Sequence, residues 1–117
     1  MQSSIADIPH LTDHEKAALA DLVKGLNASL GRRLQRVVLY GSKARGDFDA
    51  DSDLDVLVVV DRRTIDSLDK VSACSSDIDI EYGLPLSVVS LDIPALEQPS
   101  LFIRNVQKDG IELWSRR

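Results

Sequence analysis

An unbroken run of valine and leucine from Val56 to Val60 places the strongest constraint on how this chain can fold. Side chains alternate between the two faces of a strand, so a strand that is apolar at every position must be covered on both faces. We therefore expect Leu54–Val60 to be a central strand with helices packed on either side. Two carboxylates, Asp53 and Asp55, stand at the beginning of this strand and need a separate explanation.

The rest of the chain alternates between patterns typical of helices and of strands. Thr12 and Glu15 have capping-box spacing, and Gly31 is a typical helix stop. Gly83 and Pro85 end a later segment that Thr64 opens. The expected elements are a helix between Thr12 and Gly31, a strand from Leu34 to Tyr40, the central strand, a helix from Thr64 to Gly83, a strand from Leu86 to Leu91, a loop from Asp92 to Ser100, a helix from about Leu101 to Lys108, and a strand from Ile111 to Trp114.

This order of elements predicts an α/β (α+β) fold, with one small mixed sheet of about four strands and helices packed on it. The second long helix should use Ile65, Leu68, Val71 and Ile78 as its apolar positions. The gap between the first two strands is short and polar, so those strands are either antiparallel or joined by one or two helical turns. The length of 117 residues suits a single domain, 1–117.

Composition limits the classes of function. The net charge of −5 makes direct binding of duplex nucleic acid through a broad basic surface unlikely, although a small basic cluster can hold one phosphate group. Cys74 is the only cysteine, which fits a reducing compartment. The first ten residues do not resemble a signal peptide, and no apolar run is long enough to span a membrane. We therefore expect a cytoplasmic protein that does not enter the membrane.

The two carboxylates at the mouth of the central strand point to a metal site. Asp53 and Asp55 are two residues apart, so on a strand they face the same way and repel each other. A divalent cation relieves that repulsion, and oxygen ligands favour Mg²⁺, with Mn²⁺ as an alternative. Gly41 and Ser42 end the preceding strand, where a close backbone approach and a hydroxyl can hold phosphate oxygens.

Two basic residues stand just beyond the glycine and serine. Lys43 and Arg45 could neutralise phosphate charge and are weaker nucleotide-binding candidates. These parts together suggest phosphoryl or nucleotidyl transfer, which depends mainly on positioning and charge neutralisation. His10 and His14 could also share a helical face, but without further ligands nearby they are better explained as solvated residues at a helix start.

These residues resemble a known signature. Gly41-Ser42 and Asp53-x-Asp55, separated by a spacer with Ala44-Arg45-Gly46 and Ser52, are similar to the motif of the minimal nucleotidyltransferase (MNT) domains of the DNA polymerase beta superfamily. The resemblance implies that Gly41 and Ser42 hold a nucleoside triphosphate, with ATP favoured, and that Asp53 and Asp55 bind Mg²⁺ and are catalytic. It also implies transfer of a nucleoside monophosphate to a hydroxyl acceptor with release of pyrophosphate.

The chain departs from this family at one position. Active members carry a third carboxylate on a later strand, where it completes the site for the catalytic metal. The matching strand here, "LSVVSL", offers Ser87 and Ser90 instead. The spacing does not assign the missing role to any nearby acid; these are Asp77, Asp79, Glu81 and Asp92.

The departure leaves two functional hypotheses open. The first is an Mg²⁺-dependent nucleotidyltransferase that uses ATP and a hydroxyl acceptor, which could lie on a partner protein. The second is a nucleotide-binding antitoxin or regulatory subunit, because stand-alone MNT proteins often pair with a helical HEPN protein as antitoxin and toxin. Phe102 and Ile103 are expected in the core, while Trp114 is a candidate for core or interface. The acceptor and any homo-oligomeric state stay undetermined.

Overall fold

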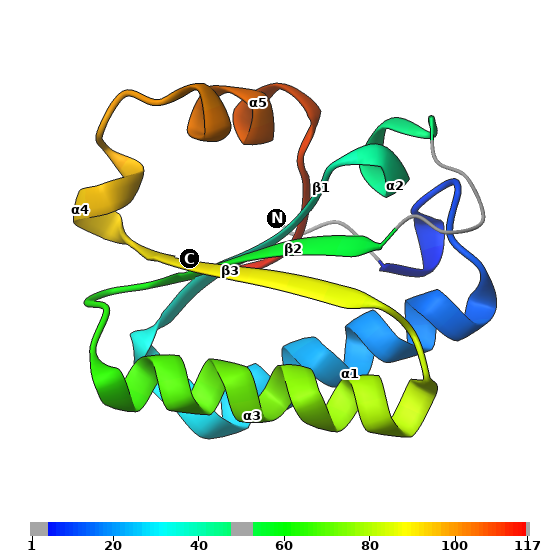
Figure 1. The fold of residues 1–117 in the computed structure, drawn as a ribbon, viewed down its shortest axis with the longest axis horizontal. Helices are drawn as coiled ribbons and strands as arrows, with labels where there is room; N and C mark the ends of the chain where they lie inside the picture. The colour runs from blue at the N-terminus through cyan, green and yellow to red at the C-terminus, as the bar shows by residue number, and fades with distance from the viewer. Residues whose placement is uncertain (1–4, 48–52, 117) are drawn as a thin grey trace.

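The structure is a computed structural model that describes residues 5–47 and 53–116, so Ser52 of the predicted spacer lies outside the described part. Figure 1 shows a sheet with helices on both sides. In chain order the elements are the short 3-10 helix η1 (Ile5–Asp7), α1 (Asp13–Leu30), η2 (Gly31–Arg33), β1 (Leu34–Tyr40), α2 (Ser42–Arg45), β2 (Leu54–Val60), α3 (Ile65–Tyr82), β3 (Leu86–Asp92), α4 (Ile93–Leu96), α5 (Leu101–Asp109) and β4 (Ile111–Ser115).

The sheet is mixed and has four strands in the order β3-β2-β1-β4. β1 pairs antiparallel with both β2 and β4, while β2 and β3 are parallel. The predicted mixed sheet and the central place of β2 are therefore confirmed. Residues Val56–Val60 of β2 are at most 1% exposed, as expected for a strand covered on both faces.

The two faces of the sheet carry different helices (Figure 1). Val56, Val58 and Val60 point into the larger core with α1 and α3, whereas Leu57 and Val59 point into a smaller core with α4 and α5. Because side chains alternate along a strand, Asp55 lies on the same face as Leu57. Its carboxylate therefore belongs to the α4/α5 face of the sheet.

Local signals in the sequence account for most of the helix ends. Thr12 and Glu15 form the predicted capping box, and Thr64 forms a second one with Ser67. Gly31 and Gly83 cap the C-termini of α1 and α3 with positive φ. These caps satisfy backbone groups that the helix itself leaves unpaired.

Two expectations about the helices were wrong. Ile65 was assigned to the apolar positions of this helix, but it is 80% exposed, because α3 turns the line of Ser67, Val71, Cys74 and Ile78 toward the sheet. The segment after β3 was expected to be a loop, but it contains the single-turn helix α4. Asp92 caps that helix by accepting a hydrogen bond from Ala95 N.

The C-terminal apolar residues belong mainly to the interior. Ile103 is buried, and Phe102 packs in the smaller core with its ring edge-on to Tyr40 at a centroid distance of 5.3 Å. Trp114 is partly buried against the larger core, and the Arg116 guanidinium lies 5.2 Å from its ring centroid. Within the described residues, no helix combines the length and apolar character that crossing a bilayer requires.

Candidate functional site

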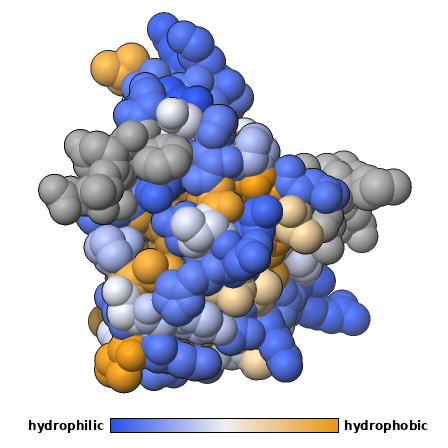
Figure 2. Space-filling model, turned by 90° about the vertical axis from the view of Figure 1, so that its right-hand side faces the viewer, coloured by the Kyte–Doolittle hydropathy of each residue, from blue (hydrophilic) through white to orange (hydrophobic). Residues whose placement is uncertain are grey.

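The candidate site lies where the end of β1 meets the beginning of β2. The antiparallel register pairs Tyr40 with Asp55, so the turn at Gly41 stands beside the Asp55 carboxylate. The short helix α2 begins at Ser42 directly after this turn. Figure 2 shows this side of the molecule, where a largely hydrophilic surface is broken by smaller apolar areas.

Gly41 is required at this turn for two reasons. Its φ of 79° belongs to a region that residues with a side chain rarely adopt. A Cβ placed on Gly41 would also overlap Oδ2 of Asp55 and lie 3.2 Å from its Cγ. The backbone therefore approaches the carboxylate more closely than any other residue would allow.

Gly41→Ala is expected to destabilise the fold more than Gly31→Ala does. Both glycines have positive φ, which costs an alanine about 1–3 kcal/mol. No atom lies within 4 Å of a Cβ built on Gly31, so the overlap with Asp55 is specific to Gly41. Thermal unfolding of the two variants measures the difference. Equal losses of stability would contradict the close approach of Gly41 to Asp55.

The two aspartates carry an electrostatic cost. Asp55 is half-buried and Asp53 is exposed. Burial raises the pKa of Asp55, the charge of Asp53 raises it further, and Arg45 partly opposes both effects. Burial and the Asp55 charge likewise raise the pKa of Tyr40. Two carboxylates that repel each other in this way could together bind one divalent cation, and the cation would stabilise the charged form of both.

Arg45 is a positively charged residue whose charge acts on Asp55. Its side chain is exposed, and its Nε donates to Oδ2 of Asp47 at 3.0 Å. That hydrogen bond raises the pKa of Arg45, and the charges of Asp47, Asp109 and Asp55 act in the same direction. Arg45 therefore lies at the surface, paired with Asp47 and close enough to Asp55 to interact with its charge.

Lys43 has a different environment. Its Nζ lies 2.8 Å from Oε2 of Glu15 in α1, and the two side chains are only 10% and 8% exposed. Glu15 Oε1 also accepts a hydrogen bond from Thr12 N. The ammonium group is thus paired with α1, and the phosphate contact expected of Lys43 stays a prediction. The ion pair ties α2, and with it the turn at Gly41, to the first helix.

Breaking this ion pair is expected to destabilise the fold strongly. Glu15→Gln keeps a capping group but removes the carboxylate that pairs with the buried Lys43 ammonium, which should cost about 3 kcal/mol or more. Burial opposes ionisation of Glu15, but Lys43 and Thr12 outweigh it and lower its pKa. The pair's contribution should therefore be lost as pH falls through the folded-state pKa of Glu15.

Arg33→Gln supplies the matched control for Glu15→Gln. It breaks the Arg33–Asp66 ion pair, whose side chains are 33% and 60% exposed. Exposed pairs contribute less than about 1 kcal/mol. Urea unfolding at neutral and acidic pH compares the two variants. An equal, small loss for both would show that Lys43 and Glu15 are not held out of water.

The register of β3 decides which of its two serines lies beside Asp55. Ser87 is the parallel partner of Asp55, and the alternation of β3 places it on the same face of the sheet. Ser90 faces the larger core, where its side chain is 9% exposed. The sequence alone could not choose between the two serines, because that choice depends on the register between β2 and β3.

The four acids that might have replaced this carboxylate lie elsewhere. Asp92 pairs with Val60 at the opposite end of the sheet, where it accepts hydrogen bonds from Arg63 N and Ala95 N. Asp77, Asp79 and Glu81 are on α3, which covers the other face of the sheet. Among residues 5–47 and 53–116, no three His, Cys, Asp or Glu side chains gather into a metal-binding group.

The two histidines have separate structural surroundings. His14 Nε2 lies 2.7 Å from the Tyr82 carbonyl oxygen. His10 has a φ of 72°, and its ring lies against Gly46 so closely that a Cβ there would be 2.6 Å from Nε2. The ring thus fills the space beside the turn that ends α2. Contacts from α1 and the segment before it, through Glu15 and His10, were not apparent from the sequence, because they join distant segments.

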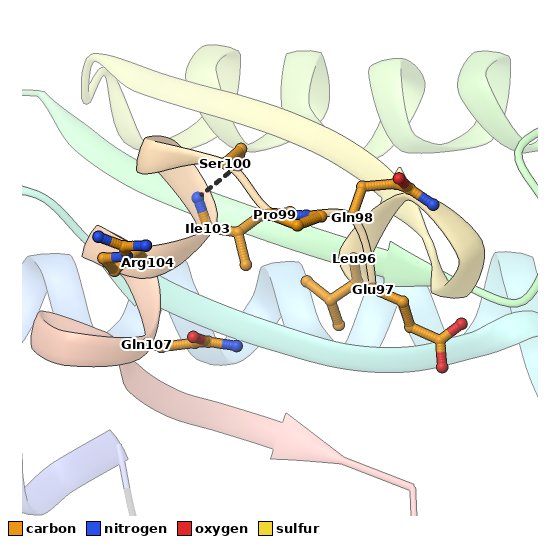
Figure 3. Close-up of a pocket in the computed structure, with 8 residues that line it drawn as sticks. All are labelled: Leu96, Glu97, Gln98, Pro99, Ser100, Ile103, Arg104 and Gln107. Carbon is orange, nitrogen blue, oxygen red and sulfur yellow. Dashed lines mark hydrogen bonds between the residues drawn. The ribbon is translucent and has the colours of Figure 1, made fainter.

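A cavity of about 220 Å³ lies on the same side of the sheet, between α4 and α5 (Figure 3). Ser100 accepts a hydrogen bond from Ile103 N at its edge and so caps α5. None of the predicted site residues lines this cavity. Its lining is formed by Leu96, Glu97, Gln98, Pro99, Ser100, Ile103, Arg104 and Gln107.

A mixed four-stranded sheet with a glycine-serine turn against paired aspartates defines the class of the nucleotidyltransferases. The chain belongs to the polymerase beta nucleotidyltransferase family, described as "Polymerase beta, Nucleotidyltransferase", which matches residues 26–117. The expected family is therefore confirmed. Enzymes of this class generally use a divalent metal ion.

Individual relatives agree with this assignment. The chain is 31% identical over 96 residues to "Putative protein adenylyltransferase MJ0141" of Methanocaldococcus jannaschii, covering 81% of this chain and 94% of that protein. A solved structure of a "putative minimal nucleotidyltransferase" is 25% identical, with a TM-score of 0.54, covering 86% of this chain and 95% of the other. A fold likeness also extends to a solved complex of tri-AMPylated Shewanella oneidensis HEPN toxin with MNT antitoxin, at 18% identity and a TM-score of 0.57, covering 86% and 72%.

Proposed function

We propose that this chain transfers a nucleoside monophosphate from a nucleoside triphosphate, ATP in the first instance, to a hydroxyl group on a partner protein. The observation that carries the proposal is the close approach of the Gly41 backbone to the carboxylate of Asp55, beside Asp53. Support for a protein acceptor and for AMP comes from the similarity to a protein adenylyltransferase and to the complex with an AMPylated toxin.

In this proposal Asp53 and Asp55 hold Mg²⁺, or Mn²⁺ in its place. Bound there, the cation would neutralise charge on the triphosphate and on the departing pyrophosphate. The turn at Gly41 and Ser42 receives phosphate oxygens, and Arg45 adds positive charge at the surface. The acceptor hydroxyl oxygen forms a bond to the α-phosphorus while the bond from that phosphorus to pyrophosphate breaks, and the hydroxyl proton leaves to solvent. Lys43 supports α2 through Glu15.

Thermal unfolding with ATP and Mg²⁺ tests the nucleotide site directly. A ligand present at about 100 times its dissociation constant stabilises the folded state by roughly 2.7 kcal/mol. We expect this stabilisation with ATP and Mg²⁺ together, and a smaller one when EDTA removes the metal. Absence of any shift over a broad ATP concentration range would reject the nucleotide site.

Labelled ATP then tests transfer. A HEPN-like protein encoded beside this chain's gene is the first acceptor to supply, and label should appear on it only with metal present. We also propose that the protein acts in the cytoplasm and that residues 1–117 form a single domain. Absence of label on any hydroxyl-bearing acceptor would contradict catalysis without contradicting nucleotide binding.

A second candidate function is a nucleotide-binding antitoxin or regulatory subunit with weak or no catalysis of its own. Ser87 favours it, because a neutral hydroxyl stands beside Asp55 on the strand where the family resemblance implies a third carboxylate. For this function, the double variant Asp53→Asn, Asp55→Asn should lose nucleotide binding yet still neutralise a partner toxin. Loss of neutralisation in that variant would favour the enzymatic function.

A further inference from the structure

The helical layer formed by α1 and α3 carries an unusual share of the charge. α3 contains five acidic residues and one lysine, and α1 contains three acidic residues and two lysines. The two helices together therefore hold a charge of −5, which equals the net charge of the whole chain. This layer covers the face of the sheet that lies away from Asp55 (Figure 1).

The acidic residues near the end of α3 are unfavourable for the helix itself. Asp79 and Glu81 stand near its C-terminus, where the helix dipole favours positive charge, and the last turn has no basic residue. Asp77 and Glu81 are also four residues apart, a spacing at which like charges repel by a few tenths of a kcal/mol. Local rules broken at a small cost often mark a functional surface.

A groove of about 380 Å³ runs between the two helices at this acidic end. Its floor is apolar, because Leu22, Cys74 and Ile78 are all at most 9% exposed. Three of its α1 residues, Gly25, Ala28 and Ser29, are small, so the backbone of a docked segment can approach closely there. The lining consists of Asp21, Leu22, Lys24, Gly25, Ala28, Ser29, Cys74, Asp77, Ile78 and Glu81.

Contacts inside the groove hold its shape. Ser29 Oγ lies 3.6 Å from Cys74 Sγ across the two helices. Nearer the rim, the Tyr82 hydroxyl donates to the Asp21 carboxylate, which joins the end of α3 to α1. Three acids, Asp21, Asp77 and Glu81, therefore surround the apolar floor, with Lys24 as the one basic residue of the lining.

We propose that this groove docks a basic amphipathic helix of the partner protein. The apolar side of such a helix would cover the floor, and its lysines or arginines would meet the three rim acids. A second copy of this chain does not fit, because two such layers would bring like charges together. A nucleic acid is excluded for the same reason. This inference rests on the proposed function only in taking the docked protein to be the acceptor of the nucleotidyl group.

The position of the groove suits an enzyme that acts on its partner. The nucleotide site opens on the α4/α5 face, and the groove lies between α1 and α3 on the other side of the sheet. Docking there leaves the Asp55 site uncovered, so the partner can stay bound while a separate segment of it reaches the nucleotide. Docking and transfer can therefore be tested separately.

The probe is a labelled synthetic helix of leucine and lysine, about five turns long, with a leucine–glutamate helix as its counterpart. Fluorescence anisotropy measures binding to the intact chain. We expect the lysine helix to bind at least about tenfold more tightly than the glutamate helix, and its affinity to fall as salt is raised. Equal binding of the two helices would overturn the proposal.

Charge reversal at the rim tests the site itself. Asp77→Lys with Glu81→Lys should weaken binding by roughly tenfold or more. The same variant should unfold at an unchanged or higher temperature, because it places lysines where the dipole favours them. Asp69→Lys with Asp79→Lys makes the same change in net charge on the same helix outside the groove, and should weaken binding far less. Equal weakening by both variants would show that net charge alone attracts the probe.

Filling the groove tests its shape. Ala28 is exposed in the groove lining, and Ala20 is exposed on the same helix outside it. Ala28→Trp should block binding of the lysine helix, and Ala20→Trp should not. Neither variant should change the thermal shift with ATP and Mg²⁺, so a failed docking test stays distinct from a failed nucleotide site. Unchanged binding in Ala28→Trp, or sedimentation that shows a dimer in the parent chain and a monomer in this variant, would overturn the proposal.

Discussion

The double variant Asp53→Asn, Asp55→Asn is expected to lose nucleotidyl transfer by about a thousandfold or more. A bound divalent ion stabilises transition-state charge by several kcal/mol, and each 1.4 kcal/mol corresponds to a factor of ten in rate. Asparagine keeps the shape of the side chain but removes the charge that holds the cation. Transfer of labelled AMP to an acceptor, compared at saturating metal, measures the loss.

The same double variant is expected to unfold at a higher temperature than the parent chain when no metal is present. Burial and the Asp53 charge raise the pKa of Asp55, so its ionised form costs stability at neutral pH. For a raised acid pKa, this cost is present above the folded-state pKa and is relieved as pH falls through it. The gain in unfolding temperature should therefore shrink on acidification.

Asp69→Asn with Asp79→Asn is the matched control for that variant. It removes two exposed carboxylates from α3, on the other face of the sheet, and should change neither transfer nor its metal dependence. Full activity of the Asp53, Asp55 double variant would show that the catalytic site does not lie at the beginning of β2. A fall in its unfolding temperature would mean that the two carboxylates stabilise the fold rather than strain it.

The second large effect is a gain of activity in Ser87→Asp. Residue 87 pairs with Asp55 on the same face of the sheet, so this change places a third carboxylate beside the other two. If the missing acid limits turnover, the rate should rise by roughly ten- to a hundredfold, because one ligand of the catalytic metal changes from a neutral hydroxyl to a carboxylate. Steady-state transfer of AMP with Mg²⁺ and with Mn²⁺ measures it.

Ser87→Asn separates charge from shape. It has nearly the same volume as aspartate but adds no charge, so it should not raise the rate. Ser87→Asp should also be less stable than Ser87→Asn without metal, since three carboxylates repel, and should gain more stability when metal is added. A rate in Ser87→Asp no higher than in Ser87→Asn would show that catalysis is limited elsewhere, or that binding is the chain's main role.

Several elements of the fold could be predicted from short sequence patterns because their causes are local. The ends of β1 and β2 and the Thr12 capping box were correct, since apolar periodicity and caps act over a few residues. Ile65 was misplaced because helical spacing alone does not fix which of two neighbouring rows of residues faces the core. In the packed structure the row through Ser67 faces the core instead. The helix α4 was missed because one turn gives too little periodicity.

The candidate site was predictable only in part. The DxD pair and the glycine-serine turn are local signals, and the antiparallel register brings them together. Lys43 was expected at phosphate because it follows Ser42 in the sequence. The structure pairs it with Glu15, which is far away in the chain, so no spacing rule could identify that contact.

The sequence by itself determined the central strand, the capped helices, the glycine-serine turn and the DxD pair, because each depends on neighbouring residues. The tertiary structure alone decided that Ser87 stands beside Asp55, that Asp77, Asp79 and Glu81 lie across the sheet, and that α1 and α3 form an acidic groove. Those results depend on strand register and on how the helices dock. Both are set by the free energy of the whole folded chain relative to its alternative arrangements, and not by any short stretch of sequence.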